Sequence, residues 1–93
     1  MMDEQIGVSL NRVRDCILRI KQSKFTTADV LRKYLGHFSS DIGTEATYSF
    51  NAQFGALLKR NCDYLGIKEL EKNISIEDDH GHKTTSSLWS IST

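Results

Sequence analysis

The chain lacks an excess of charge of either sign. Twelve Lys and Arg residues balance twelve Asp and Glu residues, so the formal net charge is 0 at pH 7. A strong overall field that would draw the protein to nucleic acid, to a membrane surface or to an acidic substrate is therefore excluded. Any charged binding surface must be local.

Cysteines and long apolar runs are also scarce. The two cysteines, Cys16 and Cys62, are too few for the disulfide framework of a small secreted domain. No apolar run approaches the ~20 residues that cross a bilayer, and the first residues lack the basic and apolar regions of a secretory leader. We therefore expect a cytoplasmic protein that makes no membrane contact.

Motifs of catalysis are absent as well. The sequence contains no phosphate loop, nucleophile elbow, zinc-protease motif or dinucleotide fingerprint. Its 93 residues suffice for one small core, and no linker or repeat divides them, so we expect a single domain over residues 1–93. We expect no enzyme, no cofactor and no small-molecule substrate.

Two helices are predicted in the first half. After Ser9, a possible N-cap, Leu10, Val13, Ile17 and Ile20 follow at helical spacing as far as about residue 22.

The second helix has the clearest local signal in the sequence. In Phe25-Thr26-Thr27-Ala28-Asp29-Val30, Thr26 is placed to cap a helix and Asp29 to complete a capping box. Phe25 and Val30 are spaced as a hydrophobic staple. Gly36 is expected to end this helix in the left-handed conformation.

A polar segment, residues 37–47, predicts a loop before a third helix. That helix is expected to begin near Thr47 or Tyr48 and to stop at Gly66. Its apolar face is predicted to carry Phe50, Phe54, Leu57, Leu58 and Leu65.

The apolar period changes to two beyond the third helix. Ile74 and Ile76 alternate with polar residues, and Trp89 and Ile91 do so later. This pattern predicts a β-hairpin with its tip at residues 79–82. Trp89 and Ile91 are expected to seal the hairpin onto the helices.

The predicted fold class is therefore α+β, a three-helix bundle followed by a C-terminal β-hairpin. The arrangement resembles a winged helix-turn-helix domain. The likeness rests on FTTADVLRKYLG as second helix, TYSFNAQFGALLKRNCDYLGI as third helix and NISIEDDHGHKTTSSLWSI as wing. It covers nearly the whole chain and implies a DNA-binding protein whose third helix enters the major groove.

The outward face of the third helix is predicted to bind DNA. Small residues such as Ala52 and Ala56 keep this face low, as a helix in a groove about 12 Å wide requires. Polar side chains near its start are candidates to contact base edges, and basic residues near its end are candidates to contact phosphates. With one wing residue, the predicted DNA-binding residues are Tyr48, Ser49, Asn51, Ala52, Gln53, Lys59, Arg60 and Lys83.

Two features of the sequence argue against DNA binding by these residues. Asp63 lies four residues after Lys59 and is placed to pair with it on a helix. Glu77, Asp78 and Asp79 precede Lys83 in the hairpin, which makes the predicted wing tip acidic where the resembled fold often has a basic residue.

The histidines of the tip also suggest a metal site. His80 and His82 follow two aspartates, but adjacent residues on a turn form a poor chelate, so we expect no metal.

The leading functional prediction is a small regulator or an accessory factor of replication or recombination that binds double-stranded DNA. The alternative is a winged-helix module that binds another protein, or itself, and has no DNA-binding activity. Neutral net charge and the acidic tip favour the alternative.

Overall fold

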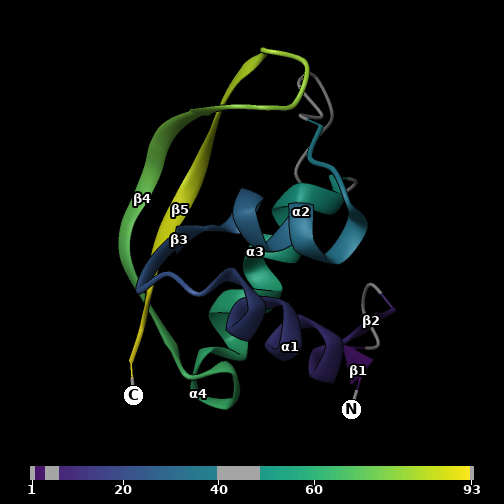
Figure 1. Cartoon of the computed structure of the whole chain (residues 1–93), viewed down its shortest axis with the longest axis vertical. Coiled ribbons are helices and arrows are strands. Elements are labelled where there is room, and N and C mark those ends of the chain that lie inside the picture. The colour runs from purple at the N-terminus through teal and green to yellow at the C-terminus, as the bar shows by residue number, and fades with distance from the viewer. Residues whose placement is uncertain (1, 4–6, 40–48, 93) are drawn as a thin grey trace.

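The computed structural model describes residues 2–3, 7–39 and 49–92. This part of the chain is an α+β fold with four helices, a three-stranded antiparallel sheet and a small two-stranded pairing (Figure 1). The elements are β1 (Met2–Asp3), β2 (Val8–Ser9), α1 (Leu10–Ile20), β3 (Lys24–Thr26), α2 (Thr27–Leu35), α3 (Phe50–Arg60), α4 (Cys62–Leu65), β4 (Ile67–Glu77) and β5 (Lys83–Ile91).

The start of α1 and both ends of α2 follow the predicted signals, whereas α1 ends at Ile20, before the predicted end near residue 22. Ser9 caps α1 by accepting the Arg12 N–H, and Thr26 forms the full capping box of α2 with Asp29. The Asp29 N–H lies 3.1 Å from Thr26 Oγ1, and the Thr26 N–H lies 2.9 Å from Asp29 Oδ2. Gly36 ends α2 in the left-handed region at φ 88°. These caps are confirmed.

The predicted helix count of three is wrong, because the third helical segment is split. Asn61 has φ −116° and ψ 19°, outside helical geometry, and its side-chain Nδ2 donates to the Leu57 carbonyl. The asparagine side chain thus competes for a carbonyl near the end of α3. The single turn of α4 follows, and Gly66 ends it at φ 70°, as predicted.

The sheet contains a strand that the sequence analysis missed. β3 pairs with β5, placing Phe25 opposite Trp89, and the strand order is β3-β5-β4. A strand of three residues that leads directly into a helix cap is too short to display an alternating pattern.

The predicted hairpin is formed by β4 and β5, but β4 already begins at Ile67. It includes the charged residues 68–72. The pairing is interrupted between Glu69 and Ile74, where Asn73 takes a positive φ of 56°. Charged side chains and bulges on an edge strand oppose pairing with a second chain.

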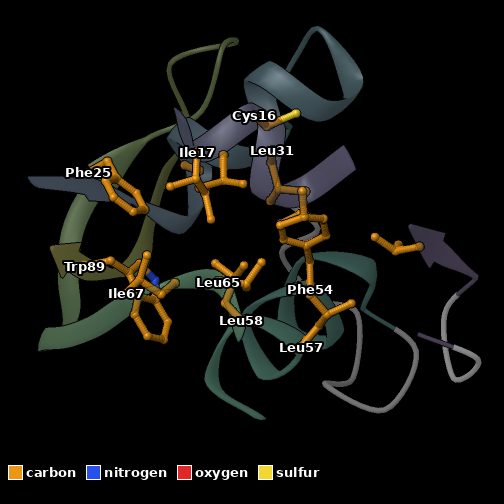
Figure 2. Packing of buried hydrophobic residues seen from close by; sticks show 14 of the residues in the cluster. Cys16, Ile17, Phe25, Leu31, Phe54, Leu57, Leu58, Leu65, Ile67 and Trp89 are labelled. Atoms are coloured by element: carbon orange, nitrogen blue, oxygen red, sulfur yellow. The ribbon is translucent and has the colours of Figure 1, made fainter. Parts of the chain in front are cut away.

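The core lies between the helices and the sheet. Figure 2 shows side chains of α1, α2, α3 and the sheet converging, with Phe54, Leu57 and Leu58 supplied by α3. Trp89 and Phe25 are each 1% exposed. Most of the predicted apolar face of α3 is buried, with Phe50 half-buried at its start. Among the described residues, no helix is long and apolar enough to cross a membrane.

Candidate nucleic-acid interface

A cleft of about 430 Å³ lies between α3, the start of α2 and the hairpin. One wall is the outward face of α3, and the facing wall is formed by β4 and β5. The lining includes Thr27 and Ala28 of α2, Ser49, Asn51, Ala52, Gly55, Ala56 and Lys59 in or next to α3, and Glu69, Lys72, Asn73, Thr84, Thr85, Ser86 and Ser87 of the hairpin.

Small side chains occupy the centre of the α3 wall. Ala52 and Ala56 are exposed, and Gly55 lies between them. A Cβ atom added at Gly55 would lie 3.9 Å from Thr27 Cγ2, an ordinary van der Waals separation. No long side chain therefore protrudes from the centre of this wall, as predicted, and a ligand can approach the helix backbone closely.

The polar residues at the start of α3 have structural partners. Ser49 is only 5% exposed, and its Oγ accepts the Ala52 N–H at 3.1 Å. Ser49 lines the cleft, but its hydroxyl caps the helix, so the side chain is not exposed on the outward face as predicted. Asn51 donates from Nδ2 to the Ser39 carbonyl at 2.8 Å and thereby ties the chain before α3 to the helix.

Basic residues stand on both walls of the cleft. Lys59, in the last turn of α3, and Lys72, on β4, are exposed and line it. Within the described residues no ion pair joins Lys59 to Asp63, because the break at Asn61 takes Asp63 off the helix that carries Lys59. The carboxylate of Glu69 accepts the Ser87 hydroxyl at 2.7 Å.

The floor joins α2 to the sheet through one buried and one partly buried hydrogen bond. Trp89 Nε1 donates to Thr27 Oγ1 at 2.9 Å, and the Ala28 N–H lies 3.4 Å from Ser86 Oγ. The first turn of α2 is thus attached to β5 at the base of the cleft.

The hairpin tip is anchored to the end of α2 and to the segment that follows it. Figure 1 shows the tip curving toward this segment. Asp79 Oδ2 accepts the Phe38 N–H at 2.7 Å, and Oδ1 accepts Arg32 Nε at 2.9 Å. The Phe38 N–H, followed by the Arg32 side chain, holds the pKa of Asp79 below its ordinary value. Arg32 also donates to the Glu77 carbonyl.

The second acidic residue of the tip is turned inward. Asp78 is 5% exposed, and its Oδ1 accepts the N–H groups of His80 and His82 at 2.9 and 2.8 Å. Its Oδ2 lies 3.3 Å from His82 Nδ1. The predicted acidic tip is therefore built from carboxylates that organise the turn and fasten it. Among the described residues, no group of three or more His, Cys, Asp or Glu side chains is arranged to hold a metal ion.

Both cysteines are free thiols that pack against the core. Burial raises the pKa of the Cys16 thiol, which favours its neutral form. In this structure both cysteines serve as small hydrophobic residues at the edge of the core.

The structure brings together four of the predicted DNA-binding residues in the cleft lining: Ser49, Asn51, Ala52 and Lys59. Gln53, Arg60 and Lys83 lie outside that lining, the first half-exposed and the others exposed. Tyr48 lies outside the described residues.

The hairpin wall of the cleft, which includes Lys72, Asn73 and Thr84 to Ser87, was not predicted from the sequence. Its one local signal is the run of four hydroxyl residues in β5.

Comparison with known proteins adds no relative. No protein-family model, no curated protein and no solved structure matches this chain.

Proposed function

We propose that this chain is a winged-helix domain that binds double-stranded DNA. The order of elements supports the fold: α1, α2 and α3 precede the β4–β5 hairpin, which stands beside α3 as a wing. The single turn of α4 is an insertion between the third helix and the wing. The connection between α2 and α3, residues 36–49, is longer than the turn of a simple helix-turn-helix.

The cleft between α3 and the hairpin carries the functional proposal. Lysines, hydroxyl groups and helix N-termini are the groups with which proteins contact the sugar-phosphate backbone. The cleft offers Lys59 and Lys72 on opposite walls, hydroxyls along β5, and the first turns of both α2 and α3. The partial positive charge of two helix starts adds to that of the lysines. In this proposal one backbone strand of the duplex occupies the cleft.

The low face of α3 suits the same partner. With Ala52, Gly55 and Ala56 at its centre, the helix backbone can approach a duplex closely. Lys59 is exposed at the far end of the helix, where it is free of the predicted pairing with Asp63.

The test is fluorescence anisotropy of a labelled mixed-sequence duplex at about 50 and 200 mM salt, a range over which phosphate contacts lose affinity steeply. The wild-type protein is expected to bind in the micromolar range at the lower salt. Lys59→Ala with Lys72→Ala is expected to weaken binding and to reduce the magnitude of the salt slope by about 1.8, which is 0.9 for each phosphate contact.

The matched control is Lys24→Ala with Lys68→Ala. Both residues lie opposite Ser90 in the sheet and outside the cleft lining, so the change of charge is the same at a different place. The control variant is expected to bind like the wild type. Equal weakening in both variants would show that charge acts without regard to the cleft, and absence of wild-type binding at the lower salt would reject DNA binding.

A protein-binding module is the second candidate function. The net charge of 0 gives no overall attraction to DNA, and a cleft lined by small and hydroxyl side chains also fits an extended peptide. If no duplex binds, light scattering at increasing protein concentration tests the simplest version, binding of a second copy.

A further inference from the structure

We infer that this domain holds duplex DNA by its backbone and does not select a base sequence. This inference rests on the proposed function and adds the class of partner, which is duplex DNA of any sequence. Three features of the described residues carry it, one on α3, one at the helix start and one at the hairpin tip.

The centre of the exposed α3 face has no hydrogen-bonding side chain. Ala52, Gly55 and Ala56 offer only methyl groups and hydrogen atoms to a bound duplex. Discrimination between base pairs there depends mainly on paired donors and acceptors, with a thymine methyl contact as the apolar contribution. This surface therefore permits close approach with little sequence information.

The polar residues nearest to that face are engaged within the protein. The Ser49 hydroxyl is buried as the α3 cap, and Asn51 uses its amide Nδ2 to hold the Ser39 carbonyl. An asparagine reads adenine by donating and accepting at the same time, so an amide committed to the main chain is poorly placed for it.

The hairpin tip is committed in the same way. The carboxylate of Asp78 binds two main-chain N–H groups of the turn, and that of Asp79 binds Phe38 and Arg32. Acceptors of this kind are what a protein uses to recognise the amino group of cytosine. Asp78 is buried and Asp79, although exposed, is hydrogen-bonded, so both carboxylates are already used within the protein.

Other groups of the cleft are suited to the DNA backbone. Lys59 and Lys72 face the cleft from opposite walls, and Thr84 and Thr85 add hydroxyls along β5. Their partners, the phosphates, occur in every sequence. Recognition then depends on the spacing of the phosphates and the shape of the grooves.

The experiment is selection from a duplex library with about 20 random base pairs, a length that exceeds one helical turn and so holds a complete half-site. The protein is presented with the library at about 50 mM salt, and bound duplexes are amplified and sequenced over several rounds. The affinities of the final and the starting pools are then compared by anisotropy.

The expected result is a final pool that binds less than tenfold tighter than the starting pool and contains no shared motif. A motif whose duplex binds tenfold or more tightly overturns the inference while leaving DNA binding intact, since about tenfold is what one well-read base pair contributes. A starting pool that does not bind at all overturns the proposed function and this inference with it.

A variant provides a second readout. Ala56→Glu places a carboxylate on the exposed wall of the cleft without filling the core. It is expected to weaken binding to several unrelated duplexes by a similar factor, more than about tenfold, through repulsion of phosphates. Thermal melting checks that the variant is folded, and weakening confined to one of the duplexes would contradict the inference.

Discussion

Replacing Thr27 by Val tests the hydrogen bond that fixes the floor of the cleft. Trp89 Nε1 donates to Thr27 Oγ1 at 2.9 Å, and the two residues are 1% and 6% exposed. Val has nearly the size and branching of Thr, so the substitution removes the acceptor without opening a cavity. It leaves the indole N–H buried with its acceptor gone.

The expected loss of stability follows from that orphaned donor. A buried polar group without a partner costs about 1–3 kcal/mol. The helix propensities of Thr and Val are similar, so the first position of α2 contributes little to the difference. For a domain of this size the loss corresponds to a fall in Tm of about 5 to 20 °C.

Intrinsic fluorescence is the assay, because the chain has one tryptophan and that residue makes the bond. Urea and thermal unfolding followed by this signal give the difference in free energy of unfolding between the two proteins. The control is Thr85→Val, the same chemical change at an exposed position of β5, with an expected effect within about 0.5 kcal/mol. If Thr27→Val destabilises the protein no more than the control does, the bond does not hold α2 to the sheet.

Two further predictions concern the tip and the cleft wall. Hydrogen bonds lower the pKa of Asp79 in the folded protein, so its stabilising contribution is present above the unfolded pKa of about 3.9 and is lost as the pH falls through the lower folded value. Asp79→Asn is therefore expected to be less stable than the wild type at pH 7 and to approach it in acid. Urea unfolding at intervals from pH 7 to about 3 measures this, and a constant difference between the two proteins would contradict the assignment. Gly55→Ala is expected to stabilise α3 by about 0.5–1 kcal/mol, because the added methyl meets only Thr27 at an ordinary distance. A lower Tm for this variant would show that the space between Gly55 and Thr27 does not accommodate an added methyl group.

Local signals in the sequence were sufficient for most of the helix boundaries. The capping box of Thr26 and Asp29 and the left-handed glycines at 36 and 66 each involve atoms no more than a few residues apart. Such interactions depend little on the rest of the chain, so short patterns predict them. The apolar face with Phe54 and Leu57 was equally readable, because helical periodicity selects the buried side.

The missed features depend on pairing between distant residues. β3 exists because Phe25 meets Trp89 across the sheet, and the tip is anchored because Asp79 reaches Arg32, which is 47 residues away in the sequence. In neither case does the local sequence around one residue indicate its distant partner. The partners of Asp78 and Asp79 were therefore not predicted, although Asp79 is exposed as expected.

The candidate site was also predicted only in part from the sequence. The sequence alone determined a helix with small residues outward and Lys59 at its end, because period and composition are properties of one segment. Only the tertiary structure decided that the hydroxyl residues of β5 and Lys72 face that helix across a cleft. It also decided that Ser49 and Asn51 are used inside the protein, because a buried or main-chain-bound polar group is satisfied by partners that folding brings to it.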